Sequence, residues 1–366
     1  MLSSMDDYPL HQIAEPIRHP VTSDRNFYDR YYFNLHGSSD ELFLVMGMGQ
    51  YPNLGVQDAF AVVRRGRKHR VVRASRPLTD RMDTTVGPFR VEVLEGLRRV
   101  RAILEPNEHG IAFDLSWEGA MPAYLEPRHF VRRHGRVLFD TMRFAQTGRW
   151  TGTLDVGDET FDVTPDRWWG TRDRSWGVRP VGESEPPGIH AGNGIMSLWN
   201  YAPIQFPDHS ILYIVQETAE GEREMEEAVC IWADPDRPPE ELGRPEHDHK
   251  FRSGTRDVES SALSFPDAPG GPLTIDVTPL VECYLAVGTG YGLEPDWKHG
   301  MYQGPELVVQ GLEIDMVDDA DRLFGIVDNV ARFESNNGDV GYGLHEYGFF
   351  GPHERYGFKD FADGAA

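Results

Sequence analysis

Alternation of hydrophobic and polar positions dominates the first half of the chain. In residues 89–93, phenylalanine and valine alternate with arginine and glutamate, which is the period-two pattern of a half-buried strand. Residues 41–51 and 136–164 are similarly rich in β-forming residues, and residues 58–75 read as two strands around a polar turn. These patterns predict a run of short antiparallel strands.

The second half repeats this pattern with more charge and more proline. Strands are expected at 209–218 and 226–234. The best helix candidate is 218–229, although a strand–loop–strand interpretation competes with it, and the proline-rich stretch 233–250 is expected to be a loop. Strands spaced about 8–12 residues apart between glycine and proline turns favour a β-sandwich or β-barrel, and without α/β alternation a Rossmann or TIM-barrel architecture is not expected.

The formal net charge of −23 is concentrated in the second half of the chain. Residues 1–182 carry 25 basic and 24 acidic residues, a balance of +1, whereas residues 183–366 carry 11 and 35, a balance of −24. This step predicts a boundary near Gly182, with domains at 20–182 and 183–352. An acidic second domain also argues against nucleic acid as a partner, because it would repel phosphate.

Composition indicates a folded globular protein, because 39% of the 366 residues are hydrophobic and 26% are charged. No apolar run reaches the roughly 18 residues of a membrane span, and residues 1–12 lack the basic start and apolar core of a secretory signal. Cys230 and Cys283 are predicted to be buried small hydrophobic residues, and they form neither a disulfide framework nor a thiolate metal site. We therefore expect a cytoplasmic protein.

Four segments carry a family resemblance: RWWGTRDRSWGVRP (167–180), SLWNYAPIQFPDHS (197–210), GTGYGLEPDWKHGMYQG (288–304) and GYGLHEYGFFG (341–351). In this two-domain β context, they resemble the lipocalin-like family that includes carotenoid 1,2-hydratase (hydroxyneurosporene synthase) and the AttH-like proteins. The resemblance implies an all-β fold, with two lipocalin-like (calycin-type) antiparallel β-barrel domains packed together. It also implies an apolar ligand such as a polyene or another isoprenoid, and it carries over no catalytic residue.

Hydration or cyclisation of an alkene begins with a proton, so the reaction needs a carboxylic acid that stays protonated near neutral pH. Burial against apolar walls raises the pKa of a carboxyl group in this way. Aromatic faces then stabilise the carbocation that forms. The expected pattern is a carboxyl group among tryptophans and tyrosines, with no organic cofactor.

The first such cluster surrounds Asp173 and contains the substrate-binding candidates Trp168, Trp169, Arg174 and Trp176. In an alternative interpretation, Asp173 forms an ion pair with Arg172 or Arg174, and the tryptophans wedge two domains together. An ion pair would lower the pKa of the carboxyl group and make it a poor acid.

Two further clusters lie in glycine-rich stretches of the second half. Asp296 is the candidate acid of one, whose substrate-binding candidates are Tyr291, Trp297, His299 and Tyr302. Glu346 is the candidate acid of the other, and Tyr201 is a further substrate-binding candidate. The alternatives are an ordinary loop for the first cluster and a strand with alternating faces for the second.

Three weaker patterns are predicted to be structural. His247, Asp248 and His249 could bind a metal, but they lie in the charged proline-rich stretch and are expected to be solvated. Residues 64–70 are a basic run expected to be a solvated hairpin turn, and residues 315–322 are acidic but lack the spacing of a calcium loop. No metal site is predicted.

Three functions stay open on the sequence. The first is a cofactor-independent enzyme that binds an apolar isoprenoid, polyene or steroid-like ligand and acts by acid-catalysed hydration, isomerisation or cyclisation. The second is a non-catalytic carrier or sequestering protein for a lipophilic ligand. The third and weakest is a β-sandwich that stacks sugars on exposed tryptophan and tyrosine. The sequence does not indicate the oligomeric state.

Overall fold

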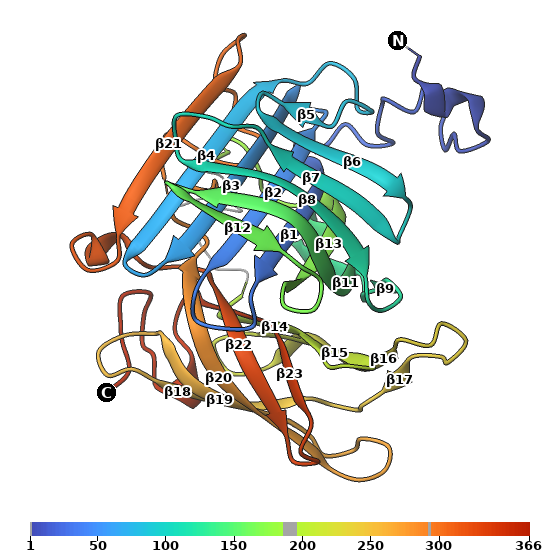
Figure 1. Cartoon of the computed structure of the whole chain (residues 1–366). Coiled ribbons are helices and arrows are strands. Elements are labelled where there is room, and N and C mark those ends of the chain that lie inside the picture. The colour runs from blue at the N-terminus through green and yellow to red at the C-terminus, as the bar shows by residue number, and fades with distance from the viewer. Residues whose placement is uncertain (1, 186–195, 292–293) are drawn as a thin grey trace.

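The computed structural model describes residues 2–185, 196–291 and 294–366, and it is all-β. Two curled antiparallel sheets form lipocalin-like barrels that pack against each other (Figure 1). The predicted fold, with two packed lipocalin-like β-domains, is confirmed. Within the described residues, the helical elements are three short 3-10 turns: η1 (Ser4–Asp7), η2 (Ala320–Arg322) and η3 (Glu354–Tyr356).

The first sheet is built mainly from the first half of the chain. Its strands are β1 (Phe27–His36), β2 (Phe43–Tyr51), β3 (Val56–Arg65), β4 (Lys68–Pro77), β5 (Thr85–Val86), β6 (Phe89–Glu95), β7 (Arg99–Leu104), β8 (Ile111–Gly119), β9 (Tyr124–Leu125), β10 (His129–Arg133), β11 (Arg136–Val156), β12 (Glu159–Val163), β13 (Trp169–Val178) and β21 (Val308–Asp315). The hydrogen-bonded order is β21-β4-β3-β2-β1-β13-β11-β8-β7-β6-β5. Because β5 also approaches β3 and β4, the sheet curls back on itself.

Because side chains alternate along a strand, one face of the first sheet lines the barrel core and the other faces the second sheet. On β1, Phe33 and Leu35 point into the barrel, whereas Tyr32 joins an apolar layer between the two sheets. The barrel core is rich in aromatic rings, including Trp150 and Trp168. The outer face of β1 therefore becomes available to a site between the sheets.

The second sheet contains β14 (Leu198–Gln205), β15 (His209–Glu217), β16 (Arg223–Trp232), β17 (Glu240–Glu241), β18 (Glu246–Phe251), β19 (Val258–Phe265), β20 (Leu273–Tyr284), β22 (Val327–Ser335) and β23 (Val340–Phe349). Their order is β17-β16-β15-β14-β23-β22-β20-β19-β18. One face packs on the first sheet through residues such as Tyr201, Ile214 and Leu344. Each fully buried apolar side chain contributes roughly 1.5–3 kcal/mol, so this layer holds the two sheets together.

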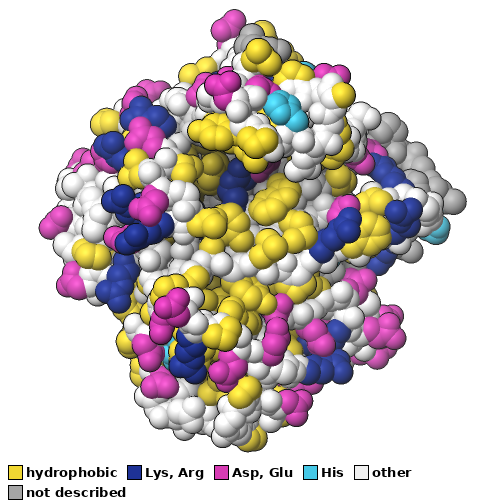
Figure 2. Space-filling view, turned by 90° about the vertical axis from the view of Figure 1, so that its right-hand side faces the viewer, with side chains coloured by type: hydrophobic (Ala, Val, Ile, Leu, Met, Phe, Trp, Pro, Cys, Tyr) yellow, Lys and Arg dark blue, Asp and Glu magenta, His cyan; other side chains and the backbone are white. Residues whose placement is uncertain are grey.

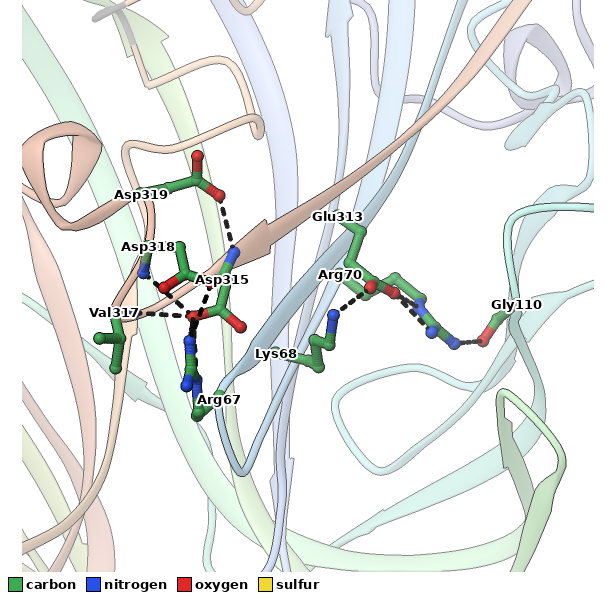
Figure 3. A network of polar contacts seen from close by, with 9 residues as sticks. All are labelled: Arg67, Lys68, Arg70, Gly110, Glu313, Asp315, Val317, Asp318 and Asp319. Carbon is green, nitrogen blue, oxygen red and sulfur yellow. Dashed lines mark hydrogen bonds and ion pairs between the residues drawn. The ribbon is translucent and has the colours of Figure 1, made fainter.

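Strand β21 comes from the second half of the chain but completes the free edge of the first sheet beside β4. Its acidic side chains meet the basic hairpin between β3 and β4 (Figure 3). Glu313 accepts hydrogen bonds of 2.6 Å from both Lys68 Nζ and Arg70 Nη2. Asp315 accepts one of 2.6 Å from Arg67 Nη2. The basic and acidic runs of the sequence thus neutralise each other across one strand pair.

Residues 218–229 form no helix, and the competing strand–loop–strand interpretation is confirmed: β15 ends at Glu217, a turn follows, and β16 begins at Arg223. The prediction of a loop at 233–250 is wrong. The proline-rich stretch 233–250 contains β17 and most of β18. Neither stretch could be assigned from its charge and proline content alone.

The two histidines of the proline-rich stretch are not solvated. His247 and His249 occupy alternate positions on β18 and are 1% and 4% exposed, because that face of the strand packs inward. His69 of the basic hairpin is also fully buried. Cys230 and Cys283 are buried and free, as predicted.

Candidate active site

A cavity of about 750 Å³ lies between the two sheets. Both sheets and the loops that follow β13 and β20 contribute to its walls. Hydrophobic side chains gather around a hollow on one face of the molecule, with many of the charged side chains around it (Figure 2). A cavity of this size accommodates a small organic molecule.

The floor of the cavity consists of the adjacent strands β1, β13 and β11. Their register forms three successive cross-strand rows. The innermost is Tyr32–Asp173–Ala145, the next is Arg30–Ser175–Arg143, and the outermost is Tyr28–Gly177–Thr141. Because side chains two residues apart share a face, these rows present aromatic, carboxyl and guanidinium groups together to the cavity.

The roof of the cavity is a row of the second sheet, in which Glu346 of β23 lies between Tyr201 of β14 and Asp328 of β22. Floor and roof are joined directly, because the Tyr32 hydroxyl donates a 2.6 Å hydrogen bond to Asp328 Oδ2. Asp173 is beside Tyr32 on the floor, and Glu346 is beside Asp328 on the roof. The two carboxyl groups therefore face the same part of the cavity, and both line it.

Asp173 is a carboxylic acid without a close basic partner. Burial raises its pKa, and the negative charge of Glu346 acts in the same direction against the opposing effect of Arg143. Among the described residues, no side chain donates a hydrogen bond to it or lies within ion-pair distance. Its carboxyl group therefore has a raised pKa and is open to a ligand.

The alternative ion pairs of Asp173 do not form, because Arg172 and Arg174 point to the opposite face of β13. Arg172 Nε donates a 2.9 Å hydrogen bond to Gln146, and Arg174 pairs with Asp29. The period-two geometry of the strand separates the charges that are neighbours in the sequence.

Glu346 has a different environment from that of Asp173. Its Oε1 accepts a hydrogen bond from the indole Nε1 of Trp199, and its side chain is hydrogen-bonded to Asp328. Burial raises the pKa of Asp328 well above its usual range, and the charge of Glu346 adds to this effect. Asp328 is therefore the protonated member of the pair and donates to the Glu346 carboxylate.

A second acid–base pair closes the side of the cavity. Arg143 Nε donates a 2.5 Å hydrogen bond to Glu126 Oε2, and the Tyr201 hydroxyl donates one of 3.2 Å to Glu126 Oε1. Burial raises the pKa of Glu126 to about 7, while Arg143 acts to lower it. Both carboxyl oxygens are engaged, which fixes Glu126 and Arg143 as structural parts of the wall.

Arg30 is held in place by His299 on the other side of the floor. The Nε2 of His299 lies 2.9 Å from the carbonyl oxygen of Thr289 and must donate to it, so Nδ1 accepts the hydrogen bond from Arg30. Burial lowers the pKa of His299 well below its usual value, which keeps the ring neutral. The guanidinium of Arg30 also lies 5.3 Å from the ring centre of Tyr291.

Four of the predicted site residues, Asp173, Glu346, Tyr291 and His299, line the cavity. Tyr201 contacts its wall through Glu126. The residues around Asp173 in the sequence have separate places: Trp168 lies in the first barrel core, Trp169 packs against Tyr342 of the second sheet, and Arg174 and Trp176 lie on the opposite face of β13 from Asp173.

The predicted acid cluster at Asp296 is divided: Tyr291 and His299 line the cavity, whereas Asp296, Trp297 and Tyr302 lie outside the lining that the structure describes. The Asp296 side chain is 71% exposed and 3.6 Å from Arg73, whose guanidinium covers the ring of the buried Trp297 at 4.4 Å. Tyr302 is 54% exposed. None of the eight tryptophans is among the exposed hydrophobic residues, so they do not form an exposed sugar-stacking surface.

Sequence reasoning missed Arg30, Glu126, Arg143 and Asp328. A signal existed for Asp328, because it is the one acidic residue in the mostly apolar run GIVDNVA, and a buried carboxyl needs a partner. Arg30 alternates with Tyr28 and Tyr32 in the printed sequence. Glu126 and Arg143 gave no local signal, because their pairing depends on β11.

The part of the chain that the structure describes contains neither a candidate metal site nor a helix that could span a membrane. Its His, Cys, Asp and Glu side chains form no group of three or more that could hold a metal ion. It also has no helix of the length and apolar character needed to cross a membrane.

The chain belongs to a family described as a family of unknown function (DUF8625), whose model matches residues 2–359. No curated protein matches it. Kievitone hydratase from Nectria haematococca has a similar structure, with a TM-score of 0.54 and 13% identity over 87% of this chain and 88% of that chain. A Nitrosomonas europaea protein assigned as AttH (NE1406) has a TM-score of 0.53 and 11% identity over 93% of this chain and 98% of that chain. These likenesses show the two-domain fold, which confirms the resemblance to AttH-like proteins at that level.

Proposed function

We propose that this protein is an enzyme that protonates a carbon–carbon double bond of a largely apolar small molecule held between its two sheets. Hydration, isomerisation or cyclisation of an isoprenoid, polyene or steroid-like ligand would follow, without an organic cofactor. The observation that carries the proposal is the Asp173 carboxyl group, which faces the cavity and has no close basic partner among the described residues.

In the proposed reaction, the carboxylic acid of Asp173 gives its proton to one alkene carbon. The π electrons form the new C–H bond and leave a carbocation on the neighbouring carbon. For hydration, water attacks that carbon while the Glu346 carboxylate takes a proton from the water. For isomerisation, Glu346 takes a proton from an adjacent carbon. For cyclisation, an internal alkene or hydroxyl captures the cation, and Glu346 takes the proton that is then lost.

The roles of the two carboxyl groups follow from their environments. Asp173 lacks hydrogen-bond donors within the described chain, and burial raises its pKa, whereas Glu346 accepts hydrogen bonds from Trp199 and Asp328. Two carboxyl groups in different environments can serve as acid and base in one site. The ring of Tyr291 and the indole of Trp199 line the same cavity and would stabilise the cation.

The fold is compatible with this chemistry. Kievitone hydratase, which shares the two-domain architecture, is named as a hydratase. Its low sequence identity transfers no residue to this chain, so the assignment of Asp173 and Glu346 depends on the cavity geometry. The aromatic rings among the lining residues support an apolar body for the ligand.

The test measures transfer of solvent hydrogen to the ligand. Native mass spectrometry and organic extraction of the purified protein identify a bound lipophile, which is then incubated with the protein in D₂O. Wild-type protein should place deuterium on carbon in the product. Asp173→Asn should lower this uptake by at least about a hundredfold, because a positioned general acid contributes 10²–10⁴-fold, while ligand affinity stays within about tenfold because amide and acid are nearly isosteric.

The alternative function is a non-catalytic carrier with the same cavity. A carrier would bind the extracted lipophile tightly and give no deuterium uptake in wild-type protein. Uptake that persists in Asp173→Asn would contradict the assignment of the acid. Loss of ligand affinity in that variant would indicate that Asp173 binds the ligand and does not protonate it.

A further inference from the structure

Most cations around the cavity have a partner. Arg143 donates to Glu126, and Arg30 donates to His299 while Asp58 supplies a nearby negative charge. Burial raises the pKa of Asp58 to about 6, so this carboxyl group is mainly ionised at neutral pH. Each of these guanidinium groups is therefore already compensated.

Three further cations contact the segment that follows β13. Arg136 pairs with Glu185, and Arg25 lies 3.8 Å from the same carboxylate. Lys298 Nζ donates a 3.1 Å hydrogen bond to Ser184. These groups hold one another around the outer part of the cavity wall.

Arg179 differs from these cations. It directly follows β13, and its backbone N–H donates to the carbonyl of Asn26 at 3.2 Å. Its guanidinium covers the ring of Tyr28 at 4.5 Å and lines the cavity. Among the residues that the structure describes, this guanidinium has no hydrogen-bond acceptor and no carboxylate within ion-pair distance.

The charge of Arg179 acts to lower the pKa of two carboxyl groups, Asp58 and Asp173. Asp58 is engaged by the Tyr51 hydroxyl at 3.2 Å and by the backbone N–H of Gly300 at 2.7 Å. If Asp173 is the neutral acid of the reaction, it cannot balance Arg179. A partly buried cation without a counter-charge is costly, and a ligand anion would relieve that cost.

We infer that Arg179 binds an acidic group on the ligand, so that the ligand is an amphipathic organic acid and not a neutral hydrocarbon. The ligand class is a carboxylate, or a comparably acidic oxygen, attached to an unsaturated apolar body. This inference rests on the proposed function, because that function requires a neutral Asp173. A guanidinium is suited to this role, since it donates parallel hydrogen bonds to a carboxylate.

The arrangement along β13 gives the ligand a direction. Asp173, Ser175 and Arg179 share one face of the extended chain and all line the cavity. The Cα atoms of Asp173 and Arg179 are six residues apart, roughly 20 Å at about 3.3 Å per residue, and the arginine side chain can span part of that distance. The acidic end would lie at Arg179 and the double bond between Asp173 and Glu346.

The experiment compares two fluorescent polyenes, cis-parinaric acid and its methyl ester, which differ in the acidic group alone. Titrations use wild-type protein, Arg179→Met, Arg179→Lys and a control, Arg101→Met, whose ion pair with Asp114 lies on β7 and β8 outside the cavity lining. We expect the acid to bind wild-type protein more tightly than the ester. Arg179→Met should weaken the acid by about tenfold to a hundredfold, as for loss of a charge-assisted hydrogen bond, and leave the ester unchanged.

Arg179→Lys should recover part of the affinity for the acid, and Arg101→Met should change neither probe. Equal affinity of wild-type protein for acid and ester would overturn the subsite while leaving the proposed reaction intact. Equal weakening of both probes by Arg179→Met would also overturn it, because Arg179 would then support the cavity wall. Failure of both probes to bind would overturn the subsite and the apolar-ligand assignment together. Selective acid binding without deuterium uptake by the extracted lipophile would uphold the subsite and reject the enzyme.

Discussion

His345 and Glu346 are neighbours on β23, yet they belong to two different groups of buried titratable side chains. Glu346 points to the cavity, where it joins Asp173 and Asp328. His345 points to the other face of the second sheet, where its ring lies 5.8 Å from that of His249. A single strand therefore separates a group of carboxyls from a group of histidines.

The histidine group is closed around one carboxylate, Glu217. The Nε2 atoms of His247 and His353 lie 3.0 and 2.9 Å from its two oxygens. Arg223 Nε lies 2.7 Å from the same carboxylate, and the Tyr356 hydroxyl is 2.6 Å from His247 Nδ1. Burial acts to raise the pKa of Glu217, but the hydrogen bonds from the histidines outweigh it and the pKa is lowered.

The comparison shows that a carboxyl group surrounded by other protein groups is not always free to contact a ligand. Glu217 is buried and its carboxylate oxygens are occupied by donors on three side chains, whereas Asp173 is half-buried at the cavity wall and has no donor in the described chain. The first arrangement stabilises a charge, and the second keeps a proton available to a ligand. A buried titratable cluster therefore indicates chemistry when one of its groups has an open side toward a cavity.

The largest stability difference is expected between Glu217→Gln and Asp173→Asn. Glu217→Gln removes the carboxylate shared by His247, His353 and Arg223, although Arg223 keeps Glu226 and Glu246 within 3.6 Å. It should reduce the free energy of unfolding by about 3 kcal/mol, as when one partner of a buried ion pair is removed. Asp173→Asn replaces a carboxyl group that has no hydrogen-bond donor in the described chain and should change stability by less than about 1 kcal/mol. Urea denaturation of the two variants measures both values.

The same two variants are also compared by deuterium uptake per folded molecule, which separates loss of activity from loss of stability. Glu217→Gln should retain it, because Glu217 lies on the face of the second sheet away from Glu346. If Asp173→Asn proved the more destabilising variant, the carboxyl group would be part of a closed network like that of Glu217. The contrast between the two clusters would then fail.

A smaller effect concerns the pH dependence of stability. Burial lowers the pKa of His345 to about 3 from an unfolded value of 6.5, so between these values the unfolded chain binds a proton that the folded chain does not. The contribution of His345 to stability is therefore complete above about pH 6.5 and is lost as the pH falls toward 3. His345→Gln removes this titration. The unfolding free energy of the variant minus that of wild type should therefore increase by about 1.4 kcal/mol for each unit by which the pH is lowered from 6 to 4.

The measurement is the difference between wild type and His345→Gln in urea denaturation at successive pH values. Taking the difference cancels the other buried histidines, such as His36 and His69, whose pKa values burial also lowers. A difference that does not vary with pH would show that His345 is not held neutral. The histidine group on the face of β23 opposite the cavity would then not be closed to solvent as described above.

The fold was accessible from the sequence where its determinants are local. The alternation in residues 89–93 corresponds to β6, and the polar turn in 58–75 corresponds to the hairpin of β3 and β4. The pairing of β21 with β4 was not accessible, because it joins residues that are more than 200 positions apart. The complementary charges of Arg67 and Asp315 become informative only when the two strands are side by side.

The candidate site likewise has features that the local sequence predicts and features that depend on the folded chain. Asp173 and Glu346 stood out because each lies among aromatic residues and glycines. Which side of β13 would face the cavity could not be read, because the same alternation places Asp173 on one face and the adjacent Arg174 on the other. His247 and His249 were assigned to solvent because charge and proline dominate their stretch, although their alternation fits the buried face of a strand.

The smallest expected effect is that of Asp296→Asn, which tests a carboxyl group three residues from the cavity-lining His299. The Asp296 side chain is 71% exposed, and its nearest basic partner is Arg73 at 3.6 Å. Because this side chain is open to water and lies outside the described cavity lining, it is not placed to protonate a ligand there, and an exposed ion pair adds little to stability. Deuterium uptake should therefore stay within about twofold of wild type, the change expected from loss of a weak surface pair. A loss of uptake as large as that in Asp173→Asn would place the proton donor beside Arg73 and Trp297. Orientation toward the cavity would then not distinguish the catalytic carboxyl group from the other carboxyl groups of the protein.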